Sequence, residues 1–320
     1  MSENKSVNRL FLTVILLYVG VSLGLSVVSV WIPALAKMSN YSSILLSQSL
    51  IFIPGFIYCK KKYGKIREVI PYHKINIATI ILVIICTYLM YPVIIVLNAI
   101  SMLFTTSGTT AVMNMMQEQN LILNILFMAV LPACVEEFMF RGILFQTYKR
   151  SRMFLAILLS GFLFGCMHMN LNQFMYAFAL GIYLAFLVEA TGSIFSSMLA
   201  HFTLNVTSVI MSFLLPILYD KVGVNQNLQV QAGGFTSTME SNELLMFLMG
   251  IAIWAVIAIG TTCAAVGIYI AICKINGRWD YVKRMFSIGT KEKIITISLV
   301  VGILISFFMM GMHIYMERAV

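Results

Sequence analysis

Apolar residues dominate the chain in long runs that short polar segments separate. A run of about twenty such residues has the length that an α-helix needs to cross about 30 Å of hydrocarbon. The pattern predicts nine spans, at residues 10–34, 43–58, 75–98, 122–146, 153–169, 173–190, 194–216, 244–273 and 294–315. We therefore expect an all-α, polytopic transmembrane helical bundle of about 8–9 spans.

Composition agrees with a membrane protein. The chain is 60% hydrophobic and only 10% charged, whereas soluble domains have about 25% charged residues. The first run follows Lys5 and Arg9, as a secretory signal would. Its apolar stretch is longer than the roughly 7–15 residues of a signal-peptide core. We expect it to be retained as the first span.

The net charge of +9 is unevenly distributed. Lys and Arg gather in alternate connections, at residues 60–74, 148–152 and 274–293. Cytoplasmic loops of membrane proteins carry such an excess, and anionic lipid attracts it. We predict a multi-pass protein of the cell membrane with a cytoplasmic N-terminus, and the charge requires no nucleic acid. The six cysteines lie in spans or at their inner ends, so no disulfide framework is expected.

The chain divides into three predicted parts. Residues 1–120 hold N-terminal spans, residues 121–215 hold spans four to seven, and residues 216–320 hold an outer loop and two final spans. Nearly all intramembrane ionisable residues fall in the second part, a predicted four-helix catalytic core. No matched pair of interrupted segments indicates the inverted halves of a transporter.

Span four contains "CVEEFMFRG" at residues 134–142. Each charge at the centre of a span costs about 2.5–3.5 kcal/mol. Glu137 and Arg141 are four residues apart and can pair on one helix face. Glu136 points about 100° away, which leaves it available as a general base. The alternative is a purely structural ion pair.

Span five ends in "SGFLFGCMHMN" at residues 160–170. Gly161 and Gly165 permit close approach of another helix. His168 falls on the same stripe, and Phe164 can cover it. A lone buried histidine is more often a packing residue, so its assignment depends on its neighbours.

Span seven carries a polar stripe at helical spacing. Such a stripe must face protein or a water-filled cavity. Its members are Ser193, Ser197, His201, Asn205, Ser208 and Ser212. His201 and Asn205 are one turn apart, so both can donate hydrogen bonds to one point.

Two chemistries suit these residues. Glu136 and His168 can activate water while His201 and Asn205 hold an oxyanion. Alternatively, His168, His201 and a glutamate can bind Zn²⁺ and leave one position for water. Both arrangements hydrolyse peptide bonds, and the sequence leaves the choice open. No H-E-x-x-H, G-x-G-D or G-x-S-G motif is present, which excludes three other designs.

Three ordered motifs resemble one family. "EEFMFR" (136–141), "FGCMH" (164–168) and "HFTLN" (201–205) are similar to E-E-x-x-x-R, F-x-x-x-H and H-x-x-x-N. These are motifs of the type II CAAX prenyl endopeptidase and bacteriocin-processing family, also called CPBP or Abi. The similarity covers about residues 121–212.

The resemblance implies specific roles. It implies that Glu136 and His168 activate water and that His201 and Asn205 stabilise the oxyanion. Glu137 and Arg141 would support the site. Family members have been described as metalloproteases and as metal-free glutamate-type proteases. The resemblance also implies a cavity that opens toward the cytoplasm.

We therefore expect an intramembrane endopeptidase that acts on a lipidated or membrane-embedded peptide, with Zn²⁺ or no cofactor. The family's substrates include prenylated CAAX tails and leader peptides of bacteriocin-like peptides. The alternative is a non-proteolytic bacteriocin-immunity or membrane scaffold protein, and a transporter is a third. Glu189 is expected to reach water at the inner end of its span, and neither it nor His313 is assigned a role.

Overall fold

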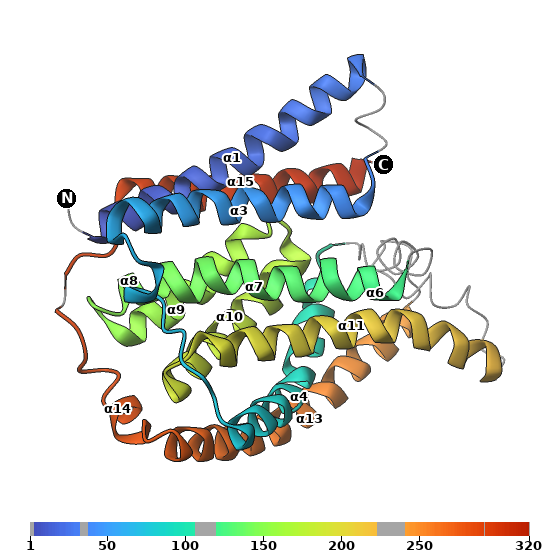
Figure 1. Ribbon diagram of the computed structural model, residues 1–320. Coiled ribbons are helices and arrows are strands. Elements are labelled where there is room, and N and C mark those ends of the chain that lie inside the picture. Colours follow the sequence, from blue (N-terminus) through green and yellow to red (C-terminus); the bar gives the residue numbers. More distant parts are fainter. Residues whose placement is uncertain (1–2, 33–37, 106–119, 223–240, 291, 320) are drawn as a thin grey trace.

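The computed structural model describes residues 3–32, 38–105, 120–222, 241–290 and 292–319. These residues form helices and no strand (Figure 1). The long uninterrupted helices are α1 (Glu3–Trp31), α3 (Asn40–Tyr63), α4 (Ile77–Ser101), α10 (Leu171–Thr191), α11 (Ile194–Val222), α13 (Ser241–Ile275) and α15 (Ile297–Ala319), and α9 (Met153–Met167) is shorter. Span four is a composite of α6 (Leu121–Asn124), α7 (Leu131–Glu137) and α8 (Phe145–Tyr148), joined by π-helical segments Ile125–Val130 and Phe138–Leu144. A short helix α14 (Trp279–Lys283) follows α13.

The predicted polytopic helical bundle is confirmed. Among the described residues, eight helices are long and apolar enough to cross a membrane. The ninth predicted span is α9, which has 15 residues and a length of about 22 Å. It ends at Met167 because the chain turns through Met169, whose φ of 49° is left-handed. The second span, at 24 residues, is longer than its apolar run suggested.

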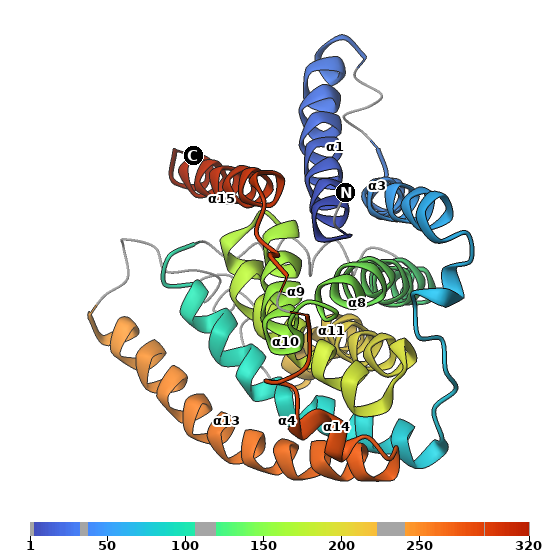
Figure 2. The same cartoon turned by 90° about the vertical axis from the view of Figure 1, so that its left-hand side faces the viewer.

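Helices α9 and α10 occupy the centre of the bundle, between two groups of outer helices. Figures 1 and 2 show α1, α3 and α15 on one side, and α4 and α13 on the other. The predicted close approach at the glycines of α9 is present. A Cβ on Gly181 of α10 would lie 2.5 Å from Gly161 Cα and 2.9 Å from Arg141 Nη2. Gly181 therefore leaves room for both a neighbouring backbone and a buried guanidinium.

Gly181→Ala is expected to destabilise the protein. The new methyl group would clash with backbone that cannot move aside, and overpacking of this kind costs about 1–3 kcal/mol. The free energy of unfolding, measured by titration with denaturing detergent, tests this. Gly20→Ala on α1 is the control because no atom lies within 4 Å of its added Cβ. Equal stabilities of the two variants would contradict the packing argument.

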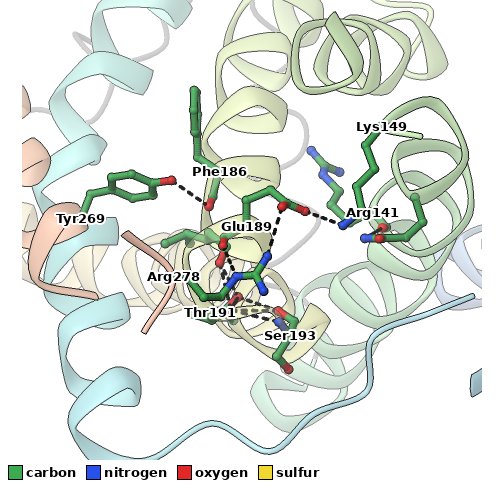
Figure 3. A network of polar contacts seen from close by, with 11 residues as sticks. Arg141, Lys149, Phe186, Glu189, Thr191, Ser193, Tyr269 and Arg278 are labelled. Atoms are coloured by element: carbon green, nitrogen blue, oxygen red, sulfur yellow. Dashed lines mark hydrogen bonds and ion pairs between the residues drawn. The ribbon is translucent and has the colours of Figure 1, made fainter. Parts of the chain in front are cut away.

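Glu189 does not reach water as the sequence suggested. Its side chain on α10 is buried, and it accepts a hydrogen bond from Lys149 Nζ at 2.7 Å. Arg278, before α14, contacts the other carboxylate oxygen at 3.3 Å. Figure 3 shows Lys149 and Arg278 approaching Glu189 from different elements. The basic residues of two loops that are distant in sequence thus hold one end of α10, which explains why Glu189 is buried.

Candidate active site

A cavity of about 690 Å³ lies between α1, α3, α7, α9, α10, α11 and α15. Its lining includes all four residues predicted to be catalytic: Glu136, His168, His201 and Asn205. Phe164 also lines it. Side chains from three separate predicted spans therefore meet at one cavity, as the motif spacing suggested.

The cavity lies toward one end of the helices that surround it. Its lining residues include Ser22 of α1, Ile44 of α3 and Met316 of α15, which belong to the halves of these helices remote from the basic loops. With those loops on the cytoplasmic side, the cavity occupies the outer half of the bundle. The cytoplasmic opening that the resemblance implies concerns the mouth of the cavity and stays a prediction. The sequence motifs do not predict where along the helices the cavity lies.

Glu136 and Glu137 end α7 and face different surroundings. Glu137 is fully buried, and its Oε1 lies 3.0 Å from Nη1 of Arg141. Glu136 is 7% exposed and lines the cavity. The predicted i,i+4 pair and the divergence of the two carboxylates are both present. The π-helical segment that begins at Phe138 is a form of helix often found at functional sites.

His201 contacts both carboxylates. Its Nδ1 lies 3.0 Å from Glu137 Oε1, and its Nε2 lies 3.9 Å from Glu136 Oε2. Because an ionised carboxylate only accepts hydrogen bonds, Nδ1 is the protonated donor toward Glu137. Nε2 is then left facing Glu136 and the cavity. Glu137 therefore orients His201 as well as pairing with Arg141, and the sequence pattern indicated only the second of these.

Phe164 packs against three members of the site. Its ring makes edge contacts with His168 and His201, at centroid distances of 5.1 Å and 5.7 Å. The guanidinium carbon of Arg141 lies 4.5 Å from the centre of the same ring. The contact with His168 is the one predicted from their spacing. One aromatic side chain thus fixes both imidazoles and a buried cation.

His168 follows the last residue of α9 and lines the cavity. Glu136 and Gln173 of α10 line the same cavity. The prediction that the helix packed on the glycines also meets this imidazole is therefore consistent with the structure. Asn205 lies one turn beyond His201, half-buried. Among the described residues it has no hydrogen-bond partner, so its amide is available to a ligand.

The structure does not gather a metal-ligand set. Within the described ranges, no three His, Cys, Asp or Glu side chains are close enough together to hold a metal ion. His168, His201 and Glu136, considered as Zn²⁺ ligands from the sequence, line one cavity but do not form such a group. Nδ1 of His201 is also engaged by Glu137. The residues as arranged do not fit a metal ion.

One contact of the site was missed by sequence reasoning. Gln48 of α3 is 7% exposed and donates a hydrogen bond from Nε2 to Glu136 Oε1 at 2.9 Å. The available signal was a glutamine in the middle of the second apolar run, since polar side chains within spans face protein or water. A polar residue in a span does not by itself predict its partner, and Glu136 is 88 positions away in the sequence.

Comparisons with known proteins support the motif-based resemblance. Residues 118–207 match the family model described as type II CAAX prenyl endopeptidase Rce1-like. The chain is 31% identical over 107 residues to "Putative membrane peptidase YdiL" of Bacillus subtilis (strain 168). That alignment covers 33% of this chain and 43% of the relative, so the chain spans less than half of that protein. No solved structure matches the chain significantly. The resemblance of residues 118–207 to the type II CAAX prenyl endopeptidase family is therefore confirmed.

Proposed function

We propose that this membrane protein is an intramembrane endopeptidase that hydrolyses a peptide bond in a lipidated or membrane-embedded peptide. The observation that carries the proposal is the meeting of Glu136, His168, His201 and Asn205 at one cavity among membrane-spanning helices. The similarity of the same region to a peptidase family supports it. Apolar residues such as Ile51 and Val209 also line the cavity, which suits a substrate that arrives from lipid.

Glu136 is the proposed general base. Its carboxylate, with His168, positions a water molecule and takes one proton from it as the water oxygen attacks the peptide carbonyl carbon. The C–N bond then breaks, and the proton held by Glu136 passes to the leaving nitrogen. Water is consumed, and a carboxylate product and an amine product result.

Asn205 and His201 are the proposed donors to the oxyanion. The Asn205 amide has no competing partner among the described residues and faces the cavity. His201 uses Nδ1–H for Glu137, so Nε2 donates to an oxyanion only when the ring carries both protons. The Glu137 carboxylate at Nδ1 and the negatively charged oxyanion at Nε2 then lie on the two sides of the ring.

Cleavage of membrane-anchored reporter peptides in proteoliposomes tests the proposal. Purified wild-type protein and Glu136→Gln are compared, each with and without a chelator. We expect cleavage by the wild type alone. Equal cleavage by the two proteins would reject Glu136 as the base. No cleavage of any prenylated or hydrophobic peptide by the wild type would favour a non-proteolytic immunity or scaffold protein.

Asn205→Ala is expected to lower kcat by about 10²–10³-fold with little change in KM, because one oxyanion donor is lost. Asn205→Asp is the matched variant: it keeps the shape but places an acceptor where a donor is needed, so it should be no more active. Steady-state cleavage of the reporter peptide measures both. A change in KM alone would show that Asn205 binds substrate instead.

A further inference from the structure

We propose that Gln48 is a positioning residue for Glu136, whose side-chain amide holds the carboxylate in the direction needed for proton transfer. The inference rests on the proposed function and extends the site beyond residues 118–207, the region that the family model matches. Gln48 lies on α3, one of the helices outside that region.

The geometry of the contact is specific. Glu136 Oε1 accepts the hydrogen bond from Gln48 Nε2 at 2.9 Å, while Glu136 Oε2 is the oxygen nearer to His201 Nε2, at 3.9 Å. The two carboxylate oxygens therefore have different neighbours on different helices. Gln48 fixes one oxygen and leaves the other turned toward the imidazole, which sets the plane of the carboxylate within the cavity.

The amide oxygen of Gln48 indicates that this side chain acts on the Glu136 carboxylate and is not there only for packing. Gln48 Oε1 is buried and has no hydrogen-bond partner among the described residues. An unpaired buried carbonyl is unfavourable, and an apolar side chain of similar size would avoid it. The contact that the amide does make is to Glu136. The presence of a glutamine at position 48 is therefore explained by its hydrogen bond to the Glu136 carboxylate.

The same amide serves both states of the base. With Glu136 ionised, Nε2–H donates to Oε1, as observed. After Glu136 Oε2 takes a proton from water, Nε2–H still donates to Oε1, which is then the carbonyl oxygen of the carboxyl group. The hydrogen bond is stronger to the charged carboxylate, so it favours the ionised base. A glutamine can hold the carboxyl group in both states in this way, and an aliphatic side chain cannot.

Gln48→Met tests the inference because it keeps the length and bulk of the side chain and removes both polar groups. We expect kcat to fall about 10- to 100-fold, as for loss of a hydrogen bond to a charged group, with KM unchanged. The acid limb of the pH–rate profile should move to higher pH, because the ionised base has lost a donor that favours it. Ser49→Ala, next on α3, is the control: in the described part of the chain its hydroxyl donates a hydrogen bond to Leu45 O of its own helix and to no other residue.

A second measurement does not need cleavage. A hydrophobic carbodiimide reacts with protonated carboxyl groups, and mass spectrometry of the peptide that contains Glu136 follows the labelling against pH, with Glu136→Gln as the blank. Gln48→Met should extend labelling to higher pH than wild type. Unchanged labelling and an unchanged pH–rate profile would overturn the inference even if wild-type protein cleaves peptides. A wild type without cleavage, but with the shifted labelling, would reject only the proposed function.

Discussion

Glu136→Gln is expected to lower kcat by about 10²–10⁴-fold, the range that general-base catalysis contributes. The substitution removes the ability to take a proton from water and keeps the size of the side chain. Glu136 is 7% exposed at the cavity wall, and no other Asp or Glu of the described residues lines the cavity, so no neighbouring carboxylate can replace it. The rate of reporter-peptide cleavage in proteoliposomes measures the effect.

The fold should survive this change. Glu136 takes no part in the Glu137–Arg141 ion pair, and a glutamine at this position can still hydrogen-bond to Gln48. The unfolding transition in detergent is therefore expected to match that of the wild type. Glu189→Gln is the control, since Glu189 is also buried but does not line the cavity. If it lowered the rate per folded molecule as much as Glu136→Gln, the loss could not be assigned to the base.

The bundle was predictable because lipid imposes a length on apolar runs. Each long run became a helix, with ends shifted by a few residues. The turn after His168 was not predictable, since the apolar pattern continues to Met169 while the backbone there adopts a left-handed φ. The nine-span pattern thus resolves into eight long helices and the shorter α9.

The pairs within single helices were also predictable. Glu137 with Arg141 and Phe164 with His168 follow from spacing alone, and both contacts are present. Contacts between helices were not: the hydrogen bond of Gln48 to Glu136 and that of His201 to Glu137 join residues 88 and 64 positions apart. Helical periodicity gives the face on which a residue lies, but not which helix packs against it.

The π-helical segments explain part of this limit. The angle assigned to Glu136 assumes 3.6 residues per turn, and span four departs from that geometry before α7 and again from Phe138. Pro132 lacks an N–H and so weakens the regular hydrogen-bond ladder at the first of these places. No local sequence signal marks the second π-helical segment. Arg141 lies in that segment, and its guanidinium packs against Gly181 and the ring of Phe164.

Arg141→Met is expected to produce the largest loss of stability, about 3–5 kcal/mol. Arg141 and Glu137 are both fully buried, so removal of the guanidinium leaves a carboxylate without its cation in the interior. Within the described chain, Nε and Nη2 of Arg141 have no hydrogen-bond partner. The cation therefore depends on Glu137 and on the face of Phe164. The free energy of unfolding, measured by titration with denaturing detergent, gives the size of the loss.

The double variant Glu137→Met/Arg141→Met separates stability from catalysis. Replacing a whole buried ion pair by apolar residues is often neutral or stabilising, so the double variant should be more stable than Arg141→Met alone. Its activity should remain about 10- to 100-fold below wild type, the range found when the group that orients a metal-bound histidine is lost, because His201 Nδ1 no longer has Glu137 as its acceptor. Recovery of both stability and activity would mean that the pair is only a brace. Recovery of stability alone would mean that Glu137 sets the ring of His201 for its work at Glu136, and that the cost of two buried charges in span four is offset by catalysis.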